Sequence, residues 1–213
     1  MLHQETVEPA TLELLSQLFS KNYLSGFALA GGTALALQLG HRISIDLDFF
    51  SYRSFNANEL TKQISSDFRL DKEFIEVEEN TLNCIINNIR VQFLTHNYQQ
   101  VRPDLNDGTI RLYSLPDSAA MKLNAVTNRG AKKDFFDIAA LLEVFSLKDM
   151  LNFYTKKYNV VNYQHVLKSL SYFEDAESEM NPVCLKKQNW TTVKKKISTS
   201  VRLYFNEMLN LKA

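Results

Sequence analysis

The stretch FALAGGTALALQLGHRISIDLDFFS, residues 27–51, combines a strand, a glycine turn, a helix and a second strand that carries carboxylates. Phe27–Ala30 is an apolar run of strand length. Gly31 and Gly32 then let the backbone approach a ligand closely, because neither residue has a Cβ atom. A helix that begins at such a turn points its free N–H groups and the positive end of its dipole outward, which predicts a phosphate site. Gly40 ends this helix.

The next segment alternates between apolar and polar residues, with the period of two that a half-buried strand requires. We expect one face to carry Ile43, Ile45, Leu47 and Phe49, and the other to carry Ser44, Asp46 and Asp48. Aspartate is depleted in strands, so two aspartates on one face call for a reason. Mg²⁺ sites typically use one or two carboxylates with water and substrate phosphate. The pattern therefore favours metal binding by Asp46 and Asp48 over a merely solvated sheet face.

A larger set of residues extends this pattern along the chain: Gly31, Gly32, Thr33, Arg42, Ser44, Asp46 and Asp48, then Lys122, Lys132, Lys133, Asp134 and Asp137. The set resembles the nucleotidyltransferase motif of the AbiEii/AbiGii toxin family, a branch of the DNA polymerase β-like superfamily. The resemblance implies a toxin of a toxin–antitoxin or phage-defence pair, with an antitoxin protein as its partner. It also implies a Mg²⁺-dependent or Mn²⁺-dependent enzyme that moves a nucleoside monophosphate from a nucleoside triphosphate to an acceptor hydroxyl. RNA, in particular the 3′ end of tRNA, is the expected acceptor.

The resemblance assigns a role to each residue of the first block. Asp46 and Asp48 would hold the metal. The triphosphate would be bound by Gly31, Gly32, Thr33, Arg42 and Ser44.

A later helix is expected to complete the site. Lys122 would stabilise the departing pyrophosphate, and Arg129, seven residues further on, would share its helix face and bind phosphate. Asp134 would either accept the proton of the attacking hydroxyl or orient Lys122. Asp137 lies one helical turn from Asp134, and an acidic first turn favoured by the helix dipole is the simpler interpretation of both aspartates.

Polymerase β-like sites usually take a third carboxylate from a later strand, and here that position holds Gln92. Ile89–Leu94 is the strand concerned. An amide oxygen brings no negative charge and is a poor base. Either the two aspartates suffice or the site is weakened, with Glu76 and Glu78 on an expected neighbouring strand as candidate substitutes.

The composition excludes a strong global attraction to nucleic acid, because 24 lysine and arginine residues balance 24 aspartate and glutamate residues. Contact with RNA would need a local basic patch. Lys186, Lys187 and residues 194–196 flank Trp190 and could form one, although a solvated helix face is the simpler alternative.

The chain starts with neither a basic segment nor an apolar one, and no apolar run approaches membrane-spanning length. Its two cysteines are too few for a disulfide framework. We therefore expect a cytoplasmic protein without a membrane partner.

Strand patterns dominate the first half of the chain and helical patterns the second. Helices are expected near residues 9–19, 56–68, 114–128, 132–145, 147–158, 163–173 and 191–211, and further strands near 74–78, 82–86, 89–94 and 109–113. This order predicts an α+β fold. In the terms of the resemblance, it is a polymerase β-like mixed sheet with flanking helices, forming a catalytic core over residues 1–115. A helical C-terminal region, residues 116–213, would complete the active site.

Two other functions compete with the transferase. Gln92 motivates a degenerate, non-catalytic module that binds a nucleotide or a partner. A small-molecule nucleotidyltransferase is the second alternative, and an acceptor screen would separate it from an RNA-modifying enzyme.

Overall fold

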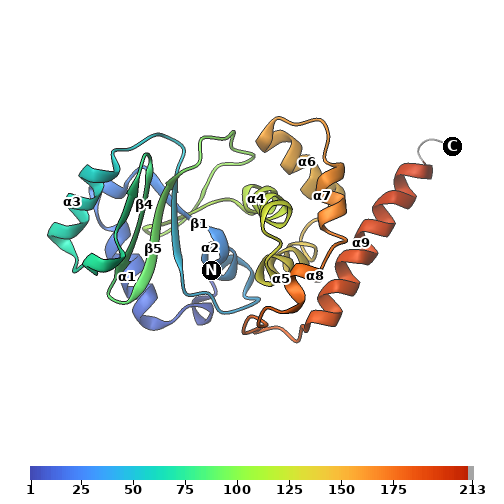
Figure 1. The fold of residues 1–213 in the computed structure, drawn as a ribbon, viewed down its shortest axis with the longest axis horizontal. Helices are drawn as coiled ribbons and strands as arrows, with labels where there is room; N and C mark the ends of the chain where they lie inside the picture. The colour runs from blue at the N-terminus through green and yellow to red at the C-terminus, as the bar shows by residue number, and fades with distance from the viewer. Residues whose placement is uncertain (211–213) are drawn as a thin grey trace. The chain divides into compact units, whose positions relative to one another are not determined.

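The structure is a computed structural model that describes residues 1–210, and it divides into two compact units. Unit 1 comprises Met1–Tyr98 and Pro103–Tyr113, while unit 2 comprises Gln99–Arg102 and the chain from Ser114 onward. The strands lie in unit 1, and the helices from α4 on lie in unit 2 (Figure 1). The expected α+β class is confirmed.

Unit 1 is built on a seven-stranded mixed sheet in the order β3-β4-β5-β2-β1-β7-β6. The strands are β1 (Phe27–Ala30), β2 (Leu47–Ser51), β3 (Glu76–Glu78), β4 (Thr81–Ile86), β5 (Ile89–Thr95), β6 (Leu105–Asp107) and β7 (Ile110–Leu112). β2 runs antiparallel to β1 and parallel to β5. The carboxylate-bearing strand is therefore central in the sheet.

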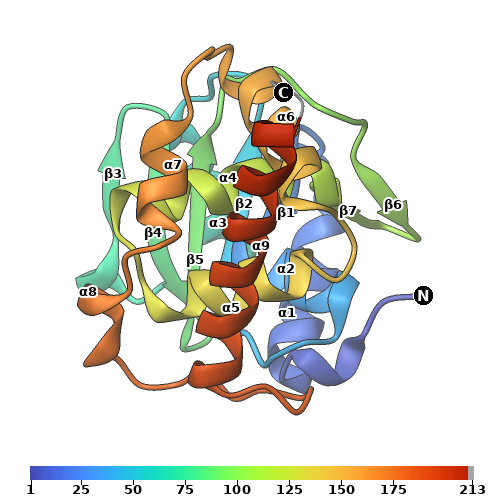
Figure 2. The same ribbon diagram turned by 90° about the vertical axis from the view of Figure 1, so that its right-hand side faces the viewer.

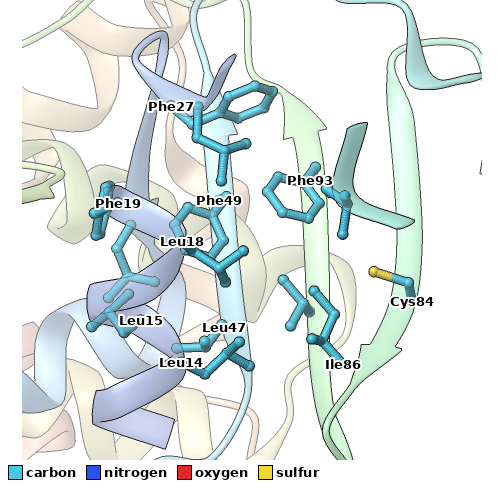
Figure 3. Close-up of a cluster of buried hydrophobic side chains, with 14 of the residues drawn as sticks. Leu14, Leu15, Leu18, Phe19, Phe27, Leu47, Phe49, Cys84, Ile86 and Phe93 are labelled. Carbon is cyan, nitrogen blue, oxygen red and sulfur yellow. The ribbon is translucent and has the colours of Figure 1, made fainter. Parts of the chain in front are cut away.

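One face of this sheet is the apolar core. The helices of unit 1 are α1 (Pro9–Phe19), α2 (Gly31–Leu39) and α3 (Ala57–Asp67). The side chains of α1 pack against β2, and the rings of Phe49 on β2 and Phe93 on β5 stack at 5.1 Å (Figure 3). Each such fully buried large side chain contributes about 2 kcal/mol of transfer free energy. This core holds β2 and β5 in register.

Glycine and asparagine residues mark several boundaries of the elements of unit 1 where the sequence predicts them. Gly40 is the C-cap of α2 with a φ of 62°. Asn87 and Asn88, with φ of 51° and 66°, form the turn between β4 and β5. Asn56 caps α3 by accepting a hydrogen bond from the backbone N–H of Glu59.

The expected strand over residues 43–49 is wrong in its first half. β2 begins at Leu47, and Ile45 is 58% exposed although the alternation places it inside. Hydrogen bonds from elsewhere hold this stretch as a loop: the Ser44 N–H donates to the Thr6 carbonyl at 2.9 Å, and the Thr33 hydroxyl donates to the Asp46 carbonyl at 2.5 Å. These bonds take the place of a strand ladder.

Unit 2 consists of helices, among which the long α9 packs on α5 (Figure 2). Its helices are α4 (Leu115–Asn128), α5 (Lys132–Leu141), α6 (Leu147–Tyr158), α7 (Gln164–Ser169), α8 (Glu174–Glu177) and α9 (Trp190–Asn210). α5 ends four residues before the expected position. The helix expected over 163–173 is shorter than predicted, because α7 ends at Ser169, and α8 is a separate helical turn beyond the expected range. Residue 211, where the last helix was expected to end, lies outside the described residues. Within residues 1–210, we find no helix that is both long and apolar enough to span a membrane.

Candidate active site

The glycine turn lies directly against a carboxylate. Ala30, the last residue of β1, pairs with Asp48 on β2, and the chain then turns into α2 at Gly31 with a φ of +66°. A Cβ atom on Gly31 would lie 1.9 Å from Asp48 Oδ2. Glycine is required here twice, for the left-handed backbone and for the space that the carboxylate occupies.

Gly32 leaves space for the guanidinium group of Arg42. A Cβ atom on Gly32 would lie 2.5 Å from Arg42 Nη2 and 3.2 Å from Ser44 Oγ. Arg42 is buried, and its Nη1 donates to the carbonyl oxygen of Ile43 at 3.0 Å. The turn therefore brings a guanidinium group and a hydroxyl to the first turn of α2.

Thr33 ties the loop before β2 to α2. Its side chain is fully buried; Oγ1 donates to the Asp46 carbonyl oxygen and lies 2.9 Å from Ser44 Oγ. Because the hydroxyl is used in this way, the group that Thr33 can offer to a ligand is its backbone N–H.

The amino terminus of α2 is suited to an anion. Ala30 is its N-cap residue, and a methyl side chain cannot accept a hydrogen bond from the first turn. The first-turn N–H groups and the positive end of the helix dipole together favour a negatively charged ligand. Unit 1 thus brings together all seven residues that the sequence predicts in its first block.

Gln92 on β5 lies beside Asp48 on the adjacent strand β2. β2 and β5 pair so that Asp48 lies opposite Gln92. Glu76 and Glu78, the candidate substitutes for a third carboxylate, lie on β3, which neighbours β4 and not β5. Glu76 lies three strands from Asp48, about 14 Å at the usual strand spacing. We conclude that Glu76 is too far to share a metal ion with Asp48.

The donor groups of unit 1 fit a hard divalent cation. The side chains of Asp46 and Asp48 offer carboxylate oxygens and that of Gln92 an amide oxygen, the ligand types that Mg²⁺ and Mn²⁺ prefer. The close approach of the Asp48 carboxylate to Gly31 places it beside the amino terminus of α2. Among residues 1–210, no cluster combines three or more histidine, cysteine, aspartate or glutamate side chains in a way that could hold a metal.

In unit 2, four of the expected residues form an ion-pair cluster around two aspartates: Lys122, Arg129, Asp134 and Asp137. Lys132 is not part of it, since its Nζ donates to the carbonyl oxygens of Glu177 and Glu179. Lys122 Nζ on α4 lies 2.8 Å from Asp134 Oδ1 and 2.6 Å from Asp137 Oδ2, both on α5. Both aspartates are fully buried. Arg129, the C-cap of α4, donates from Nε and Nη2 to the two oxygens of Asp134 at 2.7 and 2.9 Å.

This cluster makes Asp134 a weak base. Burial by itself raises the pKa of the Asp134 carboxyl, but the charges of Lys122 and Arg129 and their hydrogen bonds outweigh burial, so that its pKa lies below the ordinary value. A carboxylate with a lowered pKa holds a proton poorly. The geometry therefore favours the orienting role among the two that the sequence left open for Asp134.

The basic residues around Trp190 are largely engaged in ion pairs. Lys186 and Lys196 both pair with Glu143, at 3.0 Å each, and Lys194 pairs with Glu177. Trp190 packs on Phe135, Phe136 and Phe173 and donates from Nε1 to Glu177. The simpler alternative of a solvated helix face is thus the better description of this segment.

The sequence did not predict that the charged side chain of Asp117 in unit 2 is buried. The Asp117 carboxylate accepts hydrogen bonds from the backbone N–H groups of Val101 and Arg102, from the Ser114 hydroxyl and from Lys157 Nζ. Burial raises the pKa of Asp117, but these bonds lower it below the ordinary value. The spacing of Ser114 and Asp117 signals a helix cap; nothing in the sequence connects Asp117 to Lys157, which lies 40 residues further on.

The α+β fold, with its mixed sheet and flanking helices, is one that nucleotidyltransferases of known structure share. In structure the chain is similar to MenT4, a nucleotidyltransferase toxin from Mycobacterium tuberculosis, with a TM-score of 0.60 and 12% identity over 90% of this chain and 80% of that one. It is also similar to a putative nucleotidyltransferase from H. pylori, with a TM-score of 0.59 and 17% identity over 96% and 98% of the two chains. In sequence it is 34% identical to an uncharacterized protein of Aquifex aeolicus over 79% of this chain and 84% of that protein. Residues 13–210 match the family described as nucleotidyl transferase AbiEii toxin, type IV TA system, and the chain belongs to this family.

Proposed function

We propose that the protein transfers a nucleoside monophosphate from a nucleoside triphosphate to an acceptor hydroxyl on RNA, with Mg²⁺ or Mn²⁺ as the metal. The observation that carries this proposal is the contact between Gly31 and the Asp48 carboxylate, because it brings a carboxylate that could bind a metal to the amino terminus of α2, which is suited to an anion. Family membership supports the reaction class and an antitoxin as partner.

The residues of unit 1 divide the work of binding. The first-turn N–H groups of α2 at Gly31, Gly32 and Thr33 bind phosphate oxygens, as helix termini commonly do. Arg42, held against Gly32, adds a positive charge for the same oxygens. Asp46 and Asp48 would hold a divalent ion, which would supply polarisation of the phosphoryl oxygens and neutralisation of the charge that develops during transfer.

Two aspartates of unit 2 orient the ammonium group of Lys122. Asp134 and Asp137 hold Lys122 in one orientation, and Arg129 shares Asp134. In our proposal Lys122 contacts the departing pyrophosphate, and Asp134 and Asp137 are its positioning residues. Catalysis then rests on placement and charge neutralisation, which suffice for phosphoryl transfer.

The first experiment labels an acceptor. Purified protein is incubated with each α-³²P nucleotide, Mg²⁺ and total bacterial RNA, beside Asp46→Ala, Asp48→Ala and Lys122→Ala variants. We expect label on one RNA class, tRNA in our proposal, and a loss of label by about 100-fold or more in all three variants. Asp107 is an exposed aspartate on β6, so Asp107→Ala is the matched control and should label like wild type. Label distribution that is the same with wild type and Asp46→Ala would sink the proposal.

A non-catalytic nucleotide-binding module is the second candidate, because Gln92 stands opposite Asp48 where a third carboxylate is usual. Calorimetry that shows tight nucleotide binding without any product, over a panel of RNA and small alcohols, would favour it. Metal-dependent release of pyrophosphate would exclude it, and label on a small alcohol alone would replace RNA as the acceptor.

A further inference from the structure

A row of polar side chains crosses four strands of unit 1 and ends at Asp48. The strand register places Gln92 on β5 opposite Asp48, Asn83 on β4 opposite Gln92, and Glu76 on β3 opposite Asn83. Side chains of in-register residues on neighbouring strands project from the same sheet face. The row therefore lies on the face opposite the apolar core.

The hydrogen bonds along this row have a fixed direction. Asn83 Nδ2 donates to Glu76 Oε2 at 3.3 Å, and Gln92 Nε2 donates to Asn83 Oδ1 at 2.7 Å. An ionised carboxylate can only accept, so Glu76 sets the end of the Asn83 amide that faces it. Asn83 then turns its Oδ1 acceptor toward Gln92, and Gln92 must donate to it from Nε2.

The direction of the row determines what Gln92 offers on its other side. Nε2 and Oε1 are the two diverging ends of one planar amide, so a nitrogen turned toward β4 leaves the oxygen for the side of β2. The reverse orientation would aim an N–H donor at the Asp48 side, where it would compete with a cation for the carboxylate.

We propose that Glu76 and Asn83 form a positioning relay that directs Gln92 Oε1 toward the metal site at Asp46 and Asp48, where it serves as a neutral third oxygen ligand. This inference rests on the proposed function, because it assumes a divalent metal at the two aspartates. A neutral third ligand keeps the charge of the protein ligands at two negatives, which balances a single divalent ion. Ligand charge count is a main determinant of affinity in such sites.

The test measures metal binding without turnover. Mn²⁺ is titrated into the full-length protein in the absence of nucleotide, and the unbound ion is followed by electron paramagnetic resonance. We expect Gln92→Leu and Asn83→Leu each to weaken Mn²⁺ binding by about tenfold, since loss of a supporting partner typically costs that much. Gln92→Glu should strengthen binding, because it adds a negative charge beside Asp48.

Two further variants separate the relay from general damage to the sheet. Thr81→Val changes the residue two positions before Asn83 on the same face of β4, and it should bind Mn²⁺ like wild type. The double change Glu76→Gln with Asn83→Asp reverses the outer hydrogen bond but keeps an acceptor facing Gln92. It should restore the affinity that Asn83→Asp alone loses through two facing carboxylates.

The outcomes distinguish this inference from the proposed function. If Asp48→Asn removes Mn²⁺ binding while Gln92→Leu and Asn83→Leu leave it unchanged, the relay is refuted and the metal site stands. If Asp48→Asn leaves Mn²⁺ binding unchanged, the metal site itself is refuted. Glu76 is exposed, so Glu76→Ala tests the relay without disturbing the core, and unchanged affinity in that variant counts against it.

Discussion

At the residue scale, Gly31 joins a backbone requirement to a chemical one. Its positive φ demands glycine, and the space that a side chain would fill holds the Asp48 carboxylate. Gly108 shares the backbone requirement, with a φ of +62°, but has no atom within 4 Å of the Cβ position. The two glycines therefore allow strain and site disruption to be measured apart.

We predict that Gly31→Ala removes transferase activity, while Gly108→Ala does not. Both variants should lose about 1 kcal/mol of unfolding free energy to backbone strain, measured by urea denaturation. Gly31→Ala should also displace Asp48, and a displacement of about 1 Å at a reacting centre costs about 100-fold in rate. Equal activity in the two variants would contradict the role that we assign to this contact.

Residue chemistry also explains why part of the site was predictable. The two glycines, the two aspartates and Gln92 could be named as candidates from residue type and spacing alone. Asn83 does not, because its importance comes from a hydrogen bond to Gln92 across a strand pair. Such a contact depends on register, which the local sequence does not display.

At the element scale, a hydrogen bond joins helix α2 to the loop before β2. Thr33 on the first turn of α2 binds the Asp46 carbonyl, and Ser44 in the loop binds the Thr6 carbonyl. The loop thus holds Asp46, for which we propose a metal-binding role, through backbone groups. A change that frees the Asp46 carbonyl should loosen that aspartate.

We predict that Thr33→Val lowers both stability and activity. The partly buried Asp46 carbonyl loses its donor, which costs about 1 kcal/mol or more of unfolding free energy. The transfer rate should fall as well, because Asp46 is less well placed. Thr61→Val on α3 is the matched control. Its hydroxyl bonds to the Ala57 carbonyl of its own helix, and its loss should change stability by less than about 0.5 kcal/mol. A Thr33→Val protein with wild-type turnover would refute the coupling.

Element boundaries were predictable wherever local chemistry sets them. Gly40 ends α2, and Asn87 and Asn88 turn β4 into β5, as their backbone preferences indicate. The loop around Ile45 was missed because its sequence alternates as a strand would. Its hydrogen bonds instead join Ser44 to the Thr6 carbonyl and the Thr33 hydroxyl to the Asp46 carbonyl. β6 was missed for another reason: its three residues are all exposed, so no apolar pattern marks it.

At the scale of the whole molecule, the balanced charges are partly accounted for by buried pairs in unit 2. Lys122 and Arg129 face Asp134 and Asp137, and Lys157 faces Asp117. Charges paired in this way are not available to attract a distant polyanion. The balance therefore gives no broad basic surface to the acceptor that we propose, and recognition of that acceptor would need local contacts.

The same pairs predict how stability depends on pH. The pKa values of Asp117 and Asp134 both lie below the ordinary value. A lowered folded-state pKa adds stability that is complete above the unfolded value of about 3.9 and is lost as the pH falls through the folded value. Unit 2 should therefore lose stability on acidification below about pH 4, as protons displace the ion pairs.

Trp190 is the single tryptophan of the chain and packs against Phe136 in unit 2, so its fluorescence reports on this unit. We predict an acid transition in tryptophan fluorescence that becomes shallower in the double variant Asp117→Asn with Lys157→Met. This change removes the titrating carboxylate and its buried cation together, so no charge is left uncompensated in the interior. Lys157→Met alone should be destabilised by about 3–5 kcal/mol at neutral pH, because it leaves the Asp117 charge buried without its partner. Superimposable acid transitions in wild type and the double variant would show that Asp117 does not contribute to the pH dependence.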